Sequence, residues 1–73
     1  MNITFQQFLK RVDETYNDHP FTFRYGQTIM NVLHQVWPEK YKEIMQINYD
    51  CFYDDGMVRI TLDKLEKEWT HKD

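Results

Sequence analysis

The stretch RYGQTIMNVLHQVWP, residues 24–38, does most to decide the fold of this chain. Apolar side chains recur in it at the spacing of one helix face, which predicts an α-helix over residues 24–36. These side chains are Tyr25, Ile29, Val32, Leu33 and Val36. Gly26 weakens a helix relative to alanine, but it can let another backbone segment approach closely. Trp37-Pro38 ends this helix and predicts another over residues 38–46, because proline suits the first helical position.

The same periodicity appears on both sides of this stretch. A helix is expected over residues 4–16, where Thr4 can cap the N-terminus through its side-chain oxygen. Its apolar stripe consists of Phe5, Phe8, Leu9, Val12 and Tyr16. A last helix is expected over residues 57–69, with Asp55 as its cap. Residues 58–62 also alternate in polarity, so a strand is the competing prediction there, but the apolar stripe that continues to Trp69 favours a helix.

These elements predict a single domain, residues 1–73, of the all-α class. We expect a compact bundle of about four short helices, with an irregular aromatic and acidic loop over residues 47–56 before the last helix. A 73-residue chain has little volume for both a folding core and a deep substrate pocket, which lowers the expectation of an enzyme.

The charge balance argues against direct binding of nucleic acid. Nine lysines and arginines stand against twelve acidic residues, and the net charge is -3. A helix-turn-helix built on residues 24–46 would present Lys40 and Lys42 beside two glutamates, too little positive charge for phosphate contacts. No stretch has the length of a membrane span, and there is one cysteine, so we expect a soluble cytoplasmic protein without membrane contact.

The histidines and the cysteine show no spacing typical of a metal site. His19, His34, His71 and Cys51 are isolated in the sequence, so we expect no metal, no cofactor and no catalytic residue. Cys51 lies among aromatic and acidic residues that disfavour a thiolate, and we expect it to act as a small buried apolar residue.

The irregular loop is the best candidate for a partner-binding surface. No basic residue occurs between Glu43 and Arg59, and the stretch combines aromatic side chains with carboxylates. Tyrosine and other aromatic residues are enriched at interface hot spots. The candidate binding residues are Tyr49, Asp50, Phe52, Tyr53, Asp54 and Asp55. The alternative is that the rings close the core while the aspartates serve turns and caps.

Structural roles are expected for five further residues: Arg24, Tyr25, Gln27, Trp37 and Trp69. A cation at a helix N-terminus is unfavourable, so Arg24 is expected to pair with Asp50 or Asp54 and to tie its helix to the acidic loop.

Several of these strings together resemble a family of small proteins of unassigned activity encoded by tailed bacteriophages and related bacterial elements. The resemblance spans nearly the whole chain and is carried by Arg24-Tyr25-Gly26-Gln27, Leu33, Trp37-Pro38, Asp50-x-Phe52-Tyr53 and Trp69. The family pattern tends to have proline where this chain has Cys51. The resemblance implies a small accessory protein in the cytoplasm of an infected bacterial cell.

The function expected is binding of a host or phage protein, which the chain would modulate by inhibition and without catalysis. The alternatives are a structural or assembly homo-oligomer, with a homodimer favoured by the small core, a nucleic-acid mimic that uses an acidic face, and a small metal-dependent enzyme.

Overall fold

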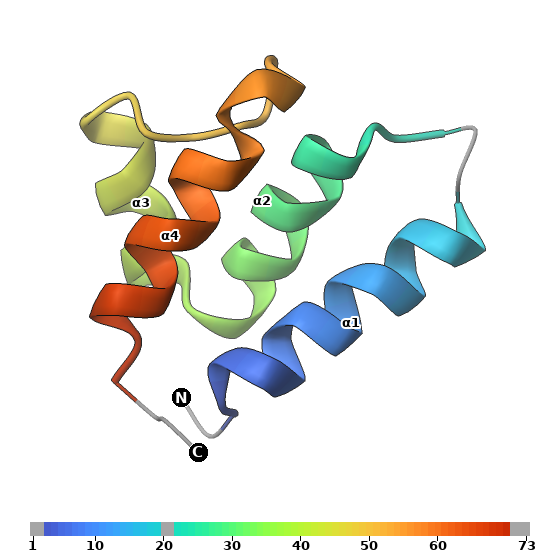
Figure 1. The fold of residues 1–73 in the computed structure, drawn as a ribbon, viewed down its shortest axis with the longest axis horizontal. Coiled ribbons are helices and arrows are strands. Elements are labelled where there is room, and N and C mark those ends of the chain that lie inside the picture. The colour runs from blue at the N-terminus through green and yellow to red at the C-terminus, as the bar shows by residue number, and fades with distance from the viewer. Residues whose placement is uncertain (1–2, 20–21, 71–73) are drawn as a thin grey trace.

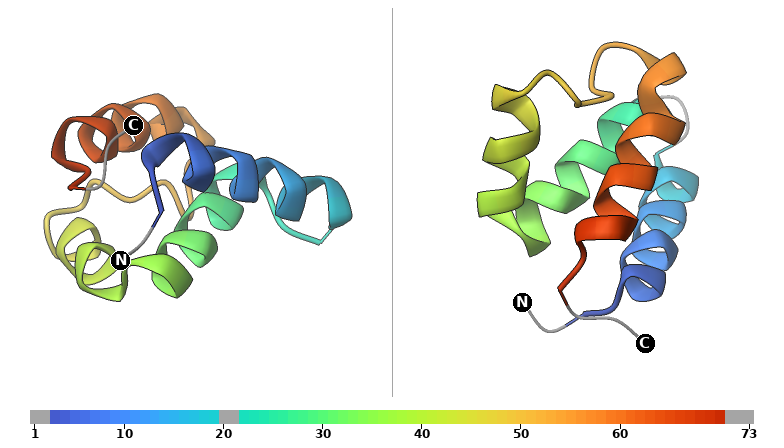
Figure 2. Two further views of the ribbon diagram at one scale, coloured as in Figure 1. Left: turned by 90° about the horizontal axis from the view of Figure 1, so that it is seen from below. Right: turned by 60° about the vertical axis from the view of Figure 1, so that its left-hand side comes forward.

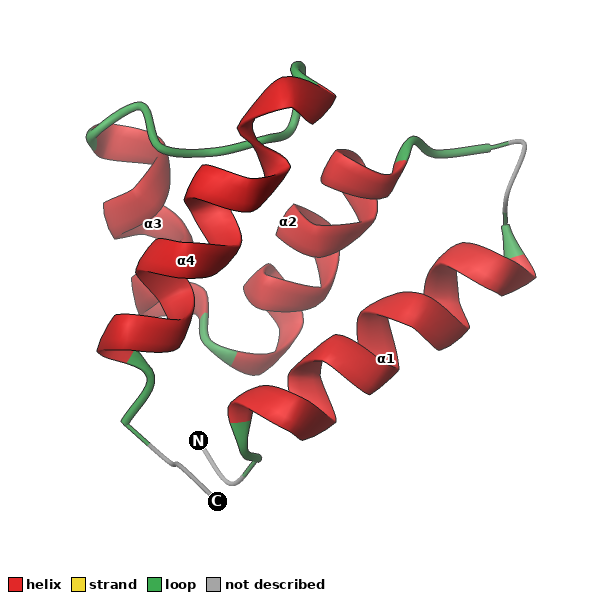
Figure 3. Cartoon of the chain, in the orientation of Figure 1, coloured by secondary structure: helices red, strands yellow, loops and turns green. Residues whose placement is uncertain are grey.

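Helices build the structure, a computed structural model that describes residues 3–19 and 22–70. Within these residues it contains α1 (Phe5–Asp18), α2 (Tyr25–Val36), α3 (Pro38–Gln46) and α4 (Val58–Glu68), with a 3-10 turn, η1 (Asp55–Met57), before α4 (Figure 1). The predicted all-α bundle is confirmed, with boundaries within two residues of those expected. The alternative of a strand over 58–62 is wrong, because these residues lie in α4 and none of the described residues forms a strand (Figure 3).

The beginning of α1 shows the local chemistry that the sequence predicts. The Thr4 hydroxyl oxygen accepts a hydrogen bond from the Gln7 backbone N–H, and the Gln7 side chain accepts one from the Thr4 N–H in return. This reciprocal pair satisfies two N–H groups that a helix start otherwise leaves free. The apolar stripe of α1 buries Phe5, Phe8 and Val12.

Helix α2 lies between α1 and α3 and contributes the largest share of the core (Figures 1 and 2). It runs antiparallel to α1. Its buried residues are Gly26, Thr28, Ile29, Met30, Val32 and Leu33. Trp37 ends α2 and also precedes the first residue of α3, Pro38, so the chain changes direction within two residues.

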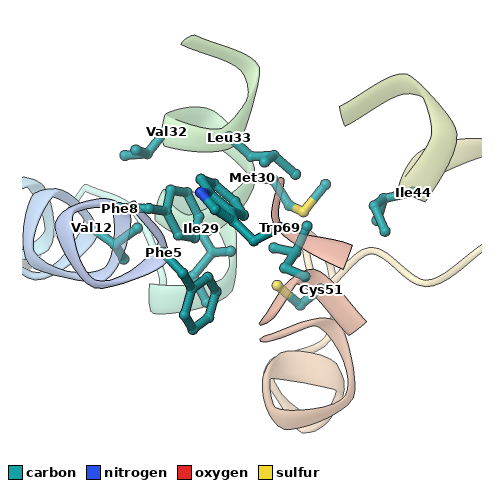
Figure 4. Close-up of a cluster of buried hydrophobic side chains, with 11 residues drawn as sticks. Phe5, Phe8, Val12, Ile29, Met30, Val32, Leu33, Ile44, Cys51 and Trp69 are labelled. Carbon is teal, nitrogen blue, oxygen red and sulfur yellow. The ribbon is translucent and has the colours of Figure 1, made fainter. Parts of the chain in front are cut away.

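Trp69 closes the core just after α4. Its ring centroid lies 5.5 Å from that of Phe5, 4.9 Å from that of Phe8 and 5.3 Å from that of Trp37. Its indole Nε1 donates a hydrogen bond to the Ile3 carbonyl oxygen at 3.0 Å. The buried cluster therefore joins residues from both ends of the described chain (Figure 4).

Tyr25 connects the other end of α1 to α2. Its hydroxyl donates to the Asp13 carboxylate at 2.6 Å, and its ring meets the Tyr16 ring edge-on at 5.2 Å. Burial, together with the hydrogen bond to Asp13, raises the pKa of Tyr25 to about 12. The phenol therefore stays protonated as a donor throughout the physiological range.

Candidate functional site

The chain between α3 and α4, residues 47–57, contains all six candidate binding residues, and we call it the connecting segment. It crosses one end of the bundle, from the C-terminal end of α3 to the first turn of α4 (Figures 1 and 3). Its path is set at Asn48, which has a φ of 61°. Asparagine adopts this left-handed conformation more readily than most residues, so the chain can leave α3 in a sharp turn.

Cys51 fixes the middle of the connecting segment to α2. Its side chain is fully buried, and its Sγ donates a hydrogen bond to the Gly26 carbonyl oxygen at 3.5 Å. The Cys51 carbonyl oxygen occupies the space where any side chain on Gly26 would have its Cβ. Burial, and less strongly the nearby Asp50 and Asp55, raise the pKa of the Cys51 thiol to about 11. The thiol therefore stays protonated near neutral pH, in keeping with its expected role as a small buried residue.

The three aspartates of the segment each accept a hydrogen bond from a backbone N–H. Asp50 accepts from Phe52 at 3.3 Å, and Asp54 accepts from Gly56 at 2.8 Å. Asp55 accepts from Gly26 at 3.3 Å, in the first turn of α2. These bonds are the turn and cap chemistry that the sequence offers as the alternative to binding.

The prediction that Asp55 caps the last helix is wrong. Asp54 caps η1, whereas Asp55 reaches across to α2. Arg24, the residue just before α2, has no side-chain oxygen that could accept from the first N–H groups of the helix. The Gly26 N–H therefore donates to Asp55, which lies 29 residues further along the chain. Gln27 adds a local hydrogen bond at the start of α2, since its side chain accepts from the Arg24 N–H at 3.1 Å.

The partner expected for Arg24 is also wrong. The guanidinium makes no ion pair with Asp50 or Asp54; its Nη2 donates to the Tyr53 backbone carbonyl oxygen at 3.4 Å. Both carboxylates are already held by nearby N–H groups of the segment. Arg24 therefore still connects α2 to the segment, but through a neutral acceptor.

The aromatic side chains of the segment have three different environments. Tyr53 is 76% exposed, and Phe52 is partly buried with its ring 4.8 Å from that of Tyr53. Tyr49 is 42% exposed and lies against α4, where the Lys64 ammonium is 5.2 Å from its ring centroid. The Thr61 hydroxyl donates to the Tyr49 carbonyl oxygen. Tyr49 thus lies against α4, whereas Tyr53 is exposed beside Phe52.

An open groove of about 310 Å³ runs beside Tyr49. Its other lining residues belong to α4 and are both apolar and charged. They are Ile60, Asp63, Lys64, Lys67 and Glu68.

An ion-pair network around the buried Lys40 lies next to this groove and was not predicted from the sequence. Lys40, only 8% exposed, donates to Glu43 at 2.9 Å and to Glu68 at 2.8 Å, and its ammonium lies 5.0 Å from the Trp37 ring centroid. Lys64 donates to the second oxygen of Glu68 at 2.6 Å. Burial acts to lower the pKa of Lys40, but the two hydrogen bonds outweigh it, so that pKa is raised. The hydrogen bonds from Lys40 and Lys64 lower the pKa of Glu68 to about 2.

The two histidines that the structure describes, His19 and His34, do not gather at this site. His34 is exposed on α2, with its ring 4.6 Å from that of Tyr41, and His19 follows the end of α1. His71 lies outside the described residues. Over residues 3–19 and 22–70, no three His, Cys, Asp or Glu side chains come together as a possible metal site.

Comparison of the chain with protein-family models, with curated proteins and with solved structures found no match. Within the described part of the chain, no helix has both the length and the apolar character needed to span a membrane.

Proposed function

We propose that this chain is a non-catalytic binding protein, which docks on a protein of a bacterial host or a phage and inhibits it. The observation that carries the proposal is the exposure of Tyr53, a residue that is 76% exposed on a segment fixed to the fold at both sides. Arg24 holds the Tyr53 carbonyl, while Cys51 and Asp55 hold the backbone around it to Gly26.

An exposed ring on an anchored backbone is well suited to protein recognition. A tyrosine buries a large area on contact and has few rotatable bonds, so little entropy is lost when a partner covers it. Phe52 packs edge-on against Tyr53 and supports the ring. Tyr53 would therefore form the centre of the contact, with Phe52 below it and Tyr49 as a separate point of contact.

The aspartates are proposed to have two roles in the same surface. Through one oxygen each, Asp50, Asp54 and Asp55 hold the backbone of the segment in place. Asp54 and Asp55 are also exposed, so their negative charge surrounds the aromatic contact. Charge of this kind raises the association rate with a basic surface more than it raises the affinity.

Two observations favour binding over the alternatives from the sequence. A nucleophilic role for Cys51 is disfavoured by its burial and by its pKa of about 11. A nucleic-acid mimic needs unpaired acidic groups on one face, but Glu68 of α4 is engaged by two lysines. The setting that we propose is the host cytoplasm, from the resemblance to small phage proteins.

Affinity capture with matched variants tests the proposal. The tagged chain, the Tyr53→Ala variant and a His34→Ala control are each used as bait in bacterial lysate, and the affinity for the captured protein is then measured with purified components. His34 is a suitable control because it carries an exposed ring on α2, near the end opposite the residues that contact the segment.

A stoichiometric partner whose affinity falls at least about tenfold with Tyr53→Ala and is unchanged with His34→Ala supports the proposal. The proposal is wrong if no stoichiometric partner is captured. It is also wrong if Tyr53→Ala binds the partner as well as the original chain does.

A further inference from the structure

The connecting segment meets the start of α2 at three alternate residues, with Tyr53 in the middle. The Cys51 Sγ donates to the Gly26 carbonyl oxygen at 3.5 Å, and the Asp55 carboxylate accepts from the Gly26 N–H at 3.3 Å. Between them, the Tyr53 carbonyl oxygen accepts from the Arg24 guanidinium at 3.4 Å. The backbone that displays the exposed Tyr53 is therefore held against α2 from both sides.

Asp55 differs in this arrangement from the other two aspartates of the segment. Asp50 and Asp54 each accept from an N–H two residues further along the chain, so their bonds shape the segment without joining it to the bundle. In the part of the chain that the structure describes, Asp55 is the one aspartate of the segment whose carboxylate bonds to another helix.

The bond between Gly26 and Asp55 is the better ordered of the two polar attachments that follow Cys51. The Arg24 bond depends on a long exposed side chain, which loses conformational freedom when it is fixed. The Gly26 N–H belongs to the helix backbone, and its bond to Asp55 is partly buried. While the buried Cys51 holds the N-terminal side of Tyr53, Asp55 holds the C-terminal side.

We infer that Asp55 is a positioning residue of the proposed binding surface: by accepting from the Gly26 N–H, it holds the Tyr53 backbone in the conformation that a partner binds. The inference rests on the proposed function, because it assigns a role within the same surface. Order that the free chain already has need not be gained on binding, so a fixed Tyr53 leaves its partner more slowly. The negative charge of Asp55 has a separate effect, on the association rate, which it shares with Asp54.

Two substitutions at Asp55 separate the hydrogen bond from the charge. Asp55→Asn removes the charge but keeps a side-chain oxygen that can accept from the Gly26 N–H. Asp55→Ala removes both. Asp63→Ala is the control, because it removes a carboxylate from an exposed position of α4, outside the connecting segment.

Backbone amide relaxation by NMR measures the order of Tyr53 in the chain without a partner. We expect an order parameter of about 0.85 in the original chain, in Asp55→Asn and in Asp63→Ala, and a value below about 0.6 in Asp55→Ala. Circular dichroism confirms that each variant is folded.

The kinetics of binding to the protein captured with this chain measure the functional effect. We expect Asp55→Ala to dissociate at least about fivefold faster than the original chain. Asp55→Asn is expected to dissociate at the original rate and to associate more slowly at low salt. This second variant tests the inference by itself if Asp55→Ala does not fold, since faster dissociation of Asp55→Asn contradicts it.

Equal order of Tyr53 in Asp55→Ala and in the original chain overturns the inference. So does a dissociation rate that rises as much with Asp55→Asn as with Asp55→Ala, since the charge would then be the cause. Failure to capture a partner contradicts the proposed function instead, and the NMR measurement on the chain alone still decides whether Asp55 positions Tyr53.

Discussion

The Cys51 carbonyl oxygen fills the space that a Cβ atom on Gly26 would need, and the Cys51 thiol donates to the Gly26 carbonyl in return. Here the connecting segment lies directly on the backbone of α2. Because Asp55 also accepts from the Gly26 N–H, a single glycine carries three contacts to the segment that displays Tyr53.

Gly26→Ala is expected to lower the free energy of unfolding by about 2 kcal/mol or more, measured by urea denaturation. Alanine gains about 1 kcal/mol over glycine in helix propensity, but the clash with the Cys51 carbonyl is with backbone and outweighs it. Gly56→Ala is the control, since its Cβ would meet only the Asp54 side chain, and a loss below about 1 kcal/mol is expected. Equal stability of Gly26→Ala and the original chain would contradict the packing described.

Trp69→Ala is expected to cost about 3–5 kcal/mol, because it leaves a large cavity and removes the bond to the Ile3 carbonyl. A loss of that size is a large part of the total stability of a small domain. The control is Tyr53→Ala, where an exposed ring should change the free energy of unfolding by no more than about 0.5 kcal/mol. Thermal unfolding monitored by circular dichroism distinguishes the two variants. Similar melting temperatures for both would contradict the central position of Trp69 in the core.

The stability is expected to fall in acid as Glu68 becomes protonated. Its pKa is about 2 in the folded protein and 4.5 ordinarily, so its contribution is fully present above about 4.5 and is lost as the pH falls towards 2. The carboxylate is about one third exposed, so solvent screening keeps the contribution on the order of 1 kcal/mol. Urea midpoints of Glu68→Gln should therefore depend less on pH in this range, while those of Glu66→Gln, at an exposed position, should follow the original chain.

Cys51 is expected to react slowly with iodoacetamide in the folded protein. A pKa of about 11 against an ordinary 9.0 leaves about a hundredfold less thiolate at neutral pH, and burial slows access further. Mass spectrometry of alkylation should show at least this difference between the native protein and the protein in urea. Comparable rates in the two conditions would mean that the connecting segment is not held on α2 as described.

The sequence alone determined the helices of this protein and their order. Apolar periodicity, the Thr4 cap and the Trp37-Pro38 junction act over one or two helical turns, so they can be interpreted without knowing which surfaces meet. The sequence also predicted that another backbone segment can approach Gly26 closely, since only a residue without a side chain leaves that space. The candidate binding segment could also be predicted, because its aromatic and acidic composition interrupts the apolar periodicity of the helices.

The tertiary structure alone decided the partners of individual polar groups. Asp55 and Gly26 are 29 residues apart, Lys40 and Glu68 are 28 apart, and Trp69 and Ile3 are 66 apart. No spacing rule connects such residues, so Asp55 was expected to cap the wrong helix, Arg24 was expected to pair with a carboxylate, and the ion pairs of the buried Lys40 were not predicted. The exposure of Tyr53 could not be predicted from the sequence for the same reason. Whether its ring closes the core or faces solvent depends on which side of its backbone is anchored, and Gly26 of α2 provides that anchor.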